Sequence, residues 1–485
     1  MKRSKILGFA VGPVGAAVLG AVSLPVSTWM FGAADIGRIA MLQTVTSLAI
    51  IVFGLGLDQS YLREYHQAKD GRALFRMAIG PGLLLLALGA AAALALDPQG
   101  LARAVVGVDS AGLAGVIVLT IATAFCSRYF SLILRMEERG LAFSMSQLLP
   151  KLIFLGILLF IYLAGGERGL PQLLSAHVAG IVAAMLIFAF NTRHVWLGRA
   201  AAGGNVFGAG DLLRYGMPLM VSGLAFWGVE ALDKVSLRFL SSFTELGNYS
   251  IAVGIASVAG TLSVLFTTIW IPTAYRWADE PDCGPRIEAV AHKLVALGST
   301  LIALAGAFSW TLRFLLPAHY GAVQYLLCAC MVPPVLYATA EVSGIGAGIV
   351  RKNVPVMFSA LLAGAINLGG NLLLVPPLGA TGAAVSTAIA FFAMLVMRSE
   401  ISMRAWAPMR RSKLYLPLGV ITLVSVLFAL SGEQFSVFWT CAWQLVAIAC
   451  LVLNRSVLAE LGAGLRRGRK PAAPPVQQTA AAQTD

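Results

Sequence analysis

The feature that most constrains the fold is a series of long apolar segments that carry almost no charge. Two of them lie in residues 353–392, and no charged residue occurs between Lys352 and Arg398. Each is long enough to cross the roughly 30 Å hydrocarbon core of a bilayer. Lipid offers the backbone no hydrogen-bond partners, so such segments must form helices or a closed barrel. Barrel strands would alternate polar and apolar residues, so this pattern instead predicts an all-α polytopic membrane protein.

Composition agrees with that fold class. The 485 residues are 58% hydrophobic and only 12% charged, with a mean hydropathy of +0.82, whereas about 25% of the residues in a soluble domain are charged. The apolar pattern predicts about fourteen spans. In chain order they cover residues 6–31, 37–60, 74–96, 112–134, 141–163, 173–192, 212–240, 246–270, 288–315, 322–350, 354–375, 379–397, 414–431 and 436–454.

The net charge of +13 does not indicate nucleic-acid binding, because the basic residues form no stripe. Their distribution follows the positive-inside rule, with both termini in the cytoplasm. Only five of the 35 Lys and Arg residues would lie outside, and three lie within spans. The first apolar run continues to Phe31 without a small-x-small cleavage site, so we expect an uncleaved helix rather than a signal peptide.

Catalytic and metal-binding patterns are absent from the sequence. The six cysteines fall within spans or on the cytoplasmic side, so we expect no disulfide. Cys328 and Cys330 have no second ligand pair, which argues against zinc. There is no nucleophile constellation and no phosphate loop. We therefore predict a protein that is not an enzyme, with no catalytic residues, no metal site and no bound cofactor.

The order of features repeats along the chain. Leu212-Leu-Arg-Tyr-Gly-Met-Pro218 matches the segment from Ile6 to Pro13, and Phe243-Thr-Glu-Leu-Gly247 matches Ala33-Ala-Asp-Ile-Gly37. The offset is 205 residues at the prolines and 210 at the glycines. An even number of spans separates the copies, so they point the same way, which predicts a parallel repeat.

The Gly- and Ala-rich connection at 193–211 marks the predicted boundary between the two copies. We expect a six-helix N-lobe in residues 1–200 and a six-helix C-lobe in residues 201–405. Two further helices would occupy residues 406–455, and residues 456–485 would form a disordered basic, Pro- and Ala-rich tail.

Several ionisable residues lie inside predicted spans, where charge is costly and usually faces a cavity or a partner. Arg128 and Lys151 could face the interior or could extend to the interface. The seventh span carries Glu230, Asp233, Lys234 and Arg238 at i, i+3, i+4 and i+8, which share one helical stripe. That stripe either faces the interior or lies near the outer interface.

Glu341, in the tenth span, has no obvious local partner in the sequence. A carboxylate of that kind suits a proton or cation coupling site. The alternative is an ordinary hydrogen-bonded contact between helices.

Two motifs resemble those of a known family. Asn367 and Asn371 share one helix face. The turn Val375-Pro-Pro-Leu-Gly379 follows, and its last residue begins the motif Gly379-Ala-Thr-Gly-Ala-Ala-Val-Ser-Thr387. The second span ends in Gly54-Leu-Gly-Leu-Asp58, with Arg63 following. These patterns resemble the polysaccharide flippases of the multidrug/oligosaccharidyl-lipid/polysaccharide exporter superfamily. Asp58 and Arg63 would then form an ion pair at the cytoplasmic mouth, or would be ordinary interfacial charges.

The resemblance covers most of residues 6–397 and implies a function. The chain would move an undecaprenyl-pyrophosphate-linked oligosaccharide to the outer leaflet of the bacterial inner membrane by alternating access, for surface polysaccharide such as O-antigen or exopolysaccharide. Membrane lipids, a polysaccharide polymerase and assembly proteins are further candidate partners. The candidate residues are, for substrate binding, Arg63, Arg128, Lys151, Lys234, Asn367 and Asn371, and for H⁺ or Na⁺ coupling or gating, Asp58, Glu230, Asp233 and Glu341.

Other functions remain open. A lipid II flippase of the same superfamily would also carry two helices after the first twelve, and a cation-coupled multidrug exporter would need no anion site. A membrane-embedded glycosyltransferase would need a large outer loop with a catalytic acid or base, and the sequence contains no outer loop of that length.

Overall fold

The computed structural model describes residues 3–197, 208–278 and 280–460, which form helices and no strands. Twelve helices are long and apolar enough to cross a membrane, and α1 contains a shorter apolar stretch, Val18–Met30. The predicted all-α, multi-pass fold is confirmed. The helices are α1 (Arg3–Met30), α2 (Ala33–Gly54), α3 (Leu57–Glu64), α4 (Gly71–Leu96), α5 (Pro98–Val106), α6 (Ala111–Met136), α7 (Gly140–Leu163), α8 (Leu170–Asn191), α9 (Arg193–Trp196), α10 (Ala209–Leu240), α11 (Phe243–Trp277), α12 (Cys283–Ala307), η1 (Ser309–Thr311), α13 (Leu312–Leu315), η2 (Ala318–Tyr320), α14 (Val323–Ser343), α15 (Ile345–Ile349), α16 (Asn353–Leu378), α17 (Ala380–Ala405), α18 (Arg411–Ser431) and α19 (Ser436–Leu453).

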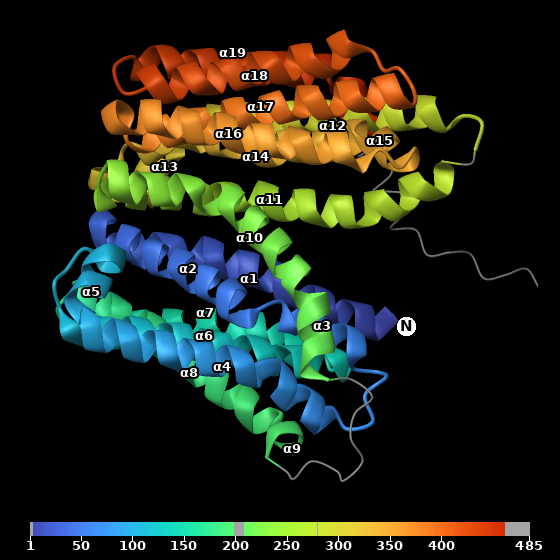
Figure 1. Cartoon of the computed structure of the whole chain (residues 1–485). Helices are drawn as coiled ribbons and strands as arrows, with labels where there is room; N and C mark the ends of the chain where they lie inside the picture. The colour runs from blue at the N-terminus through green and yellow to red at the C-terminus, as the bar shows by residue number, and fades with distance from the viewer. Residues whose placement is uncertain (1–2, 198–207, 279, 461–485) are drawn as a thin grey trace, which may run out of the picture.

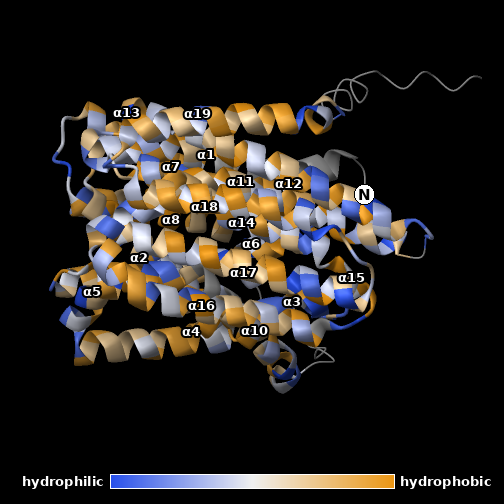
Figure 2. Cartoon of the chain, turned by 90° about the horizontal axis from the view of Figure 1, so that it is seen from above, coloured by the Kyte–Doolittle hydropathy of each residue, from blue (hydrophilic) through white to orange (hydrophobic). Residues whose placement is uncertain are grey.

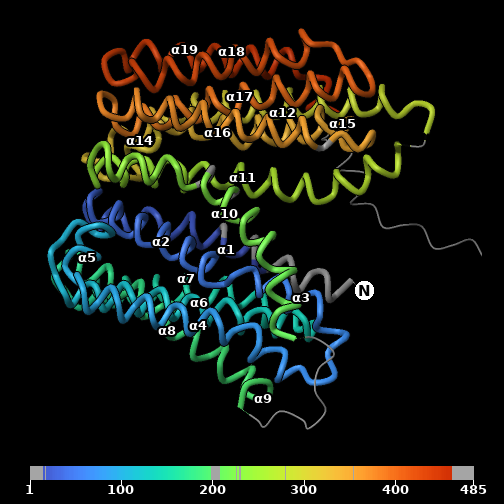
Figure 3. Tube along the Cα trace, in the orientation of Figure 1, coloured from blue at the N-terminus to red at the C-terminus, as the bar shows by residue number. Residues whose placement is uncertain are grey.

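The helices form two groups that lie side by side (Figure 1). The first group contains α1 to α9 and the second contains α11 to α19. Helix α10 crosses obliquely between them, as the trace in Figure 3 shows, and it contacts α2 and α3 on one side and α16 and α17 on the other. Helices α18 and α19 pack on the second group, against α12.

Helices α3, α9 and α15 lie at one end of the bundle, and α5 and α13 lie at the other (Figure 1). We call the first of these the basic end, because Arg63, Arg193 and Arg351 lie in or beside its helices, and the other the far end. Long helices such as α4 and α19 are coloured as hydrophobic over most of their length (Figure 2), as segments that face lipid should be. The groups diverge toward the basic end in Figure 1.

Direct contacts between the groups occur at the far end. The indole nitrogen of Trp29 donates to the carbonyl oxygen of Leu315 (2.8 Å). The hydroxyl of Tyr320 donates to the carbonyl oxygen of Phe31 (2.7 Å) and is buried. These bonds join residues almost 290 positions apart, so they fix how the two groups meet at this end.

The second predicted span is broken in the structure. Residues 37–60 were expected to form one helix, but α2 ends at Gly54 and α3 begins at Leu57. Leu55 and Gly56 have φ values of 51° and 68°, which no right-handed helix accommodates. Gly56 is needed there for a second reason, since a Cβ atom on it would collide with the backbone of Gly216 in α10.

The turn predicted at residues 375–379 is shorter than expected. Helix α16 continues through both prolines to Leu378, and the chain turns only at Gly379, where φ is 53°. The amide of Ala380 then donates to Glu245 Oε2 (2.8 Å), which ties the start of α17 to the start of α11. Such a bond satisfies one of the amides that a helix N-terminus leaves without a partner.

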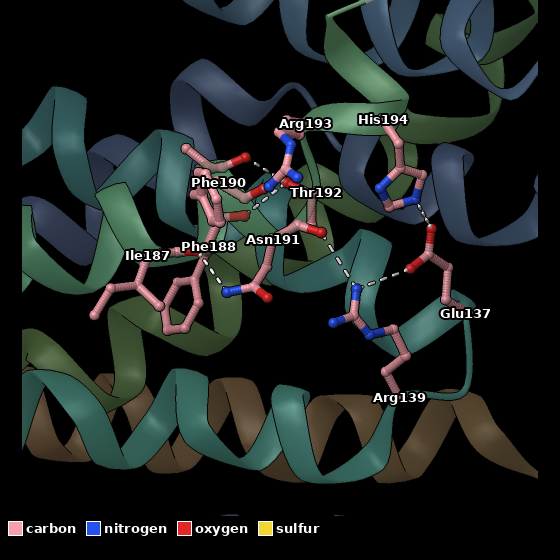
Figure 4. Close-up of polar contacts among 10 residues, drawn as sticks. Glu137, Arg139, Ile187, Phe188, Phe190, Asn191, Thr192, Arg193 and His194 are labelled. Carbon is pink, nitrogen blue, oxygen red and sulfur yellow. Dashed lines mark hydrogen bonds and ion pairs between the residues drawn. The ribbon is translucent and has the colours of Figure 1, made fainter.

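At the basic end, Glu137 holds the corner between α8 and α9 against the loop between α6 and α7 (Figure 4). His194 Nε2 lies 2.6 Å from Glu137 Oε1, and Arg139 Nη1 lies 3.6 Å from Glu137 Oε2. Arg139 also donates to the carbonyl oxygen of Asn191 (3.2 Å). These bonds stabilise the basic end of the first group.

Candidate functional site

Three adjoining cavities follow the line where the two groups meet α10 and α11: the first lies between the first group and α11, the third between α2 and α10, and the second beside α10 in the second group. Their volumes are 310, 350 and 110 Å³. Ser257 lines the first and second cavities, Lys234 the second and third, and Gln43 the third and first. Because each pair shares a lining residue, we treat the three cavities as one chamber. Its walls come from α1, α2, α7, α8, α10, α11, α14 and α17.

Lys151 lies in the wall of the first cavity, within the first helix group. Its ammonium group donates to the carbonyl oxygen of Ala16 in α1 (2.7 Å). Gly20 leaves room for it, since a Cβ atom there would lie 3.3 Å from Lys151 Nζ. Four hydroxyl groups share this cavity, from Ser23, Ser27, Ser250 and Ser257. The cavity therefore combines one cation with hydroxyl donors and acceptors, which suits an anionic, hydroxyl-rich ligand.

Lys234 and Trp227 project from α10 into the third cavity. They are seven residues apart, so they lie on one face of the helix. The Trp227 indole nitrogen donates to the Ser47 hydroxyl of α2 (2.9 Å), which connects α10 to the first group. Since Lys234 also lines the second cavity, the wall of the chamber contains a second basic residue.

Asp233 is the centre of a buried polar cluster beside the second cavity. Its side chain accepts hydrogen bonds from Asn367 Nδ2 (3.0 Å) and Asn371 Nδ2 (2.8 Å) at one oxygen, and from Thr387 Oγ1 (2.6 Å) at the other. The hydroxyl of Tyr249 also donates to it. The cluster joins α10, α11, α16 and α17, and only 5% of Asp233 is exposed.

The cluster also contains an unsatisfied acceptor. Among the described residues, no group donates to Asn371 Oδ1, although this atom is buried. The orientation of an amide side chain is assigned from its hydrogen bonds, and rotation of either Asn would bring its oxygen toward Asp233. The cluster can therefore offer carboxylate, amide and hydroxyl oxygens to a cation, or a carboxylate to a proton.

The predicted ion pair between Asp58 and Arg63 is wrong. Asp58 Oδ2 accepts from Arg128 Nη2 (2.9 Å) and from Gln59 Nε2 (2.9 Å). Arg63 instead lies over the ring of Tyr215 (4.2 Å to its centroid) and 3.3 Å from Glu64 Oε1. The break between α2 and α3 explains this arrangement, because it rotates Asp58 toward α6. Arg63 and Arg128 therefore lie toward the basic end, and neither lines the three cavities.

Glu341 has no partner nearby in the sequence, as expected, but it has one on a distant helix, which favours the alternative of a contact between helices. Arg398 Nη1 of α17 lies 2.7 Å from Glu341 Oε1, and both side chains are largely buried. The pair joins α14 to α17, and neither residue lines the chamber. The side chain of Glu230, another predicted coupling residue, lies outside the described part of the structure.

Several residues of the chamber were not predicted from the sequence. Gln43 begins the polar run Gln43-Thr-Val-Thr-Ser47 inside the second span, and that run was a signal that could have been used. Trp227 belongs to the charged stretch of α10 and was not assigned a role. The predicted sugar ligands Asn367 and Asn371 instead donate to Asp233, and they do not line the cavities.

Comparison with known proteins adds a family and a fold. A family model described as "Polysaccharide biosynthesis protein" matches residues 5–277. No curated protein matches the sequence significantly. A solved structure described as "Lipid II flippase MurJ, inward closed conformation" has 11% sequence identity and a TM-score of 0.65, covering 93% of this chain and 99% of its own. The eukaryotic MATE transporter AtDTX14 has 11% identity and a TM-score of 0.41, covering 87% and 97%. The MurJ likeness shows a shared fold.

Proposed function

The chain belongs to the polysaccharide biosynthesis protein family, and from this premise we propose that it is a flippase for undecaprenyl-pyrophosphate-linked oligosaccharides. The observation that carries the proposal is the chamber where the two helix groups meet α10 and α11, whose walls contain two basic residues, Lys151 and Lys234, together with hydroxyl groups. A pyrophosphate group needs cationic donors, and sugars need hydroxyl and amide partners.

The orientation in the membrane is part of this proposal. The basic end faces the cytoplasm, since cytoplasmic segments carry the excess of Lys and Arg, and the membrane is the bacterial inner membrane. The contacts of Trp29 and Tyr320 at the far end then close the outer side. The chamber would load from the cytoplasm, and alternating access would open the far end for release. A polysaccharide polymerase and assembly proteins would receive the product.

Coupling to an ion is assigned to the Asp233 cluster. Asp233 is the buried carboxylate beside the chamber, and its partners lie on α16 and α17. Binding of H⁺ or Na⁺ would exchange these hydrogen bonds for contacts with the cation. That exchange would change how α10 packs on the second group, and α10 also contacts the first group. The cluster is therefore placed to connect ion binding with movement of the groups.

Lipid II transport is the second candidate function, since lipid II is also a pyrophosphate-linked saccharide and the fold resembles that of a lipid II flippase. A multidrug exporter would not require two cations in the chamber. Two complementation experiments separate the first two candidates: one in a strain without its surface-polysaccharide flippase, the other in a strain depleted of its lipid II flippase. We expect the gene to restore surface glycan in the first and to leave the second unable to grow.

The direct test removes the cations of the chamber. Lys151→Ala and Lys234→Ala should each lower surface glycan by about tenfold or more at equal protein level, because a hydrogen bond to a charged group contributes roughly 1.5–3 kcal/mol. Lys293→Ala is the matched control, since Lys293 pairs with Glu460 on an exposed surface. Normal glycan from both chamber variants would refute the proposed role of the chamber.

A further inference from the structure

We propose that Gln43, Ser47 and Trp227 form a recognition site for the sugar attached directly to the pyrophosphate. This inference rests on the proposed function and identifies the part of the chamber that reads the saccharide. The three residues line the smallest cavity, of 110 Å³, together with Thr44, Ala231 and Lys234. Nothing in the family match or in the shared fold assigns a role to them.

The site is built from two facing helix stripes. On α2, Gln43 and Ser47 are four residues apart and lie on one face. On α10, Trp227 and Lys234 are seven residues apart and also share a face. The bond from Trp227 to Ser47 (2.9 Å) holds the two stripes together. A ligand in this cavity would therefore touch both helix groups at once.

Gln43 supplies the hydrogen-bonding capacity of the site. Its side chain is exposed to the chamber, and no hydrogen bond to its amide is formed within residues 3–197, 208–278 and 280–460. A carboxamide presents donors and an acceptor side by side, which complements two neighbouring hydroxyl groups of a sugar ring. Because this amide is exposed to the chamber and no described residue occupies it, a polar ligand in the chamber can bond to it.

Trp227 supplies a flat apolar surface. Its indole N–H is already bonded to Ser47, so the ring is held in one orientation. The face of an aromatic ring carries partial negative charge, and it attracts the weakly positive C–H groups of a sugar ring. An amide and an ordered indole in one cavity thus match both the polar edge and the apolar face of a sugar.

The position of Lys234 indicates which sugar of the oligosaccharide would reach this site. Lys234 lines the same cavity as Trp227, and it also reaches the second cavity. A pyrophosphate bound to this ammonium group would place its own first sugar beside Gln43 and Trp227. More distant sugars would extend into the larger cavities, where Ser23, Ser27 and Ser257 provide less directional contacts. We therefore expect the protein to be selective for the first sugar of the repeat unit.

Binding measurements on purified protein in lipid nanodiscs test the site. The probes are undecaprenyl pyrophosphate and three forms of it, each carrying one glucose, galactose or N-acetylglucosamine. We expect the wild-type chain to bind at least one glycosylated probe about tenfold more tightly than the bare lipid. Gln43→Leu and Trp227→Leu should each remove most of that difference, so they should weaken the preferred glycosylated probe clearly more than the bare lipid. Lys234→Ala should weaken all four probes.

The controls separate the two proposals. Gln172→Leu changes an amide outside the chamber and should leave binding of every probe unchanged, and Trp227→Phe, which keeps an aromatic ring, should retain part of the preference. Thermal unfolding of each variant shows whether the chain still folds. Failure of the wild-type chain to bind the bare lipid would refute the proposed function. Binding of the bare lipid with no gain from any sugar, or equal weakening of all probes by Gln43→Leu, would refute the sugar site alone.

Discussion

At the scale of single residues, the pair between Glu341 and Arg398 shows how this protein keeps charge inside the membrane. The two side chains lie 2.7 Å apart and are 11% and 19% exposed. Gly344 provides the space, because a Cβ atom there would lie 2.8 Å from Arg398 Cγ. Each charge is acceptable only while the other is present, since an unpaired charge in this environment is strongly unfavourable.

Removal of either member of the pair should therefore destabilise the protein. Glu341→Gln and Arg398→Gln should each lower the free energy of unfolding by about 3 kcal/mol, and the double variant by clearly less than their sum. Thermal unfolding in detergent measures this coupling. Arg411→Gln is the control, since it breaks the more exposed pair with Glu400 and should cost under about 1 kcal/mol. Additive effects of Glu341→Gln and Arg398→Gln would show that the two charges act independently.

Residue types at the site could be predicted from the sequence, but their partners could not. Asp233, Lys151 and Lys234 stood out because charge is rare inside apolar segments. The partner of Asp58 is Arg128, 70 positions away, and the partner of Glu341 is Arg398. Sequence spacing identifies neighbours within a helix, whereas these pairs depend on which helices pack together. Gln43 was missed because an uncharged polar residue gives a much weaker signal.

At the scale of elements, the starts of α2 and α11 pack against each other in a reciprocal way. A Cβ atom on Gly37 would collide with the carbonyl oxygen of Phe243, and one on Gly247 would collide with that of Ala33. Gly37 and Gly247 are 210 positions apart, and so are Ala33 and Phe243. Each glycine thus contacts the counterpart of the residue that its own counterpart contacts, which is the arrangement that a twofold axis produces. The axis of the predicted parallel repeat would therefore pass through this contact.

A larger residue at this contact should separate the two helices at the far end. Gly37→Leu should increase the distance between nitroxide labels at Ala34→Cys and Thr244→Cys by several ångströms, because the added side chain has only backbone to displace. Pulsed electron–electron double resonance measures the distance between the two labels in a protein whose native cysteines have been replaced. Gly32→Leu is the matched control, as a Cβ atom on Gly32 meets nothing within 4 Å. An unchanged distance in Gly37→Leu would mean that the helices are not held by this close approach.

The existence of the long helices could be predicted, but their interruptions could not. Continuous apolar segments located most of them to within a few residues. The break at Leu55 depends on a positive φ in a residue that seldom adopts it, so no propensity indicates it. Helix α5 was missed as well, although Asp97 caps its start, Pro98 follows, and Gly107 ends it with φ of 71°. These signals could have been used, but the segment was overlooked because it is too short to cross a membrane.

At the scale of the whole molecule, the position of the contacts defines one state of a transport cycle. Hydrogen bonds from Trp29 and Tyr320 join the groups at the far end, and the glycine contact of α2 and α11 lies there too. The two groups diverge toward the basic end (Figure 1). In the proposed cycle, release of cargo on the far side requires these contacts to separate. The far end would then be the gate that opens once in each cycle.

A covalent link across that gate should stop transport without preventing binding. Trp29→Cys and Leu315→Cys, joined by a short cleavable thiol cross-linker, should reduce surface glycan to background, while undecaprenyl pyrophosphate still binds the purified protein. Cleavage of the linker by a reductant should restore export. The control pair is Tyr325→Cys with Gly432→Cys, which lies within the second group and whose side chains would also be in contact. Because α14 and α18 move together in the proposed cycle, linking them should leave export intact. Full export by the protein linked between Trp29 and Leu315 would show that cargo leaves by another route, and the assignment of the far end as the gate would then be wrong.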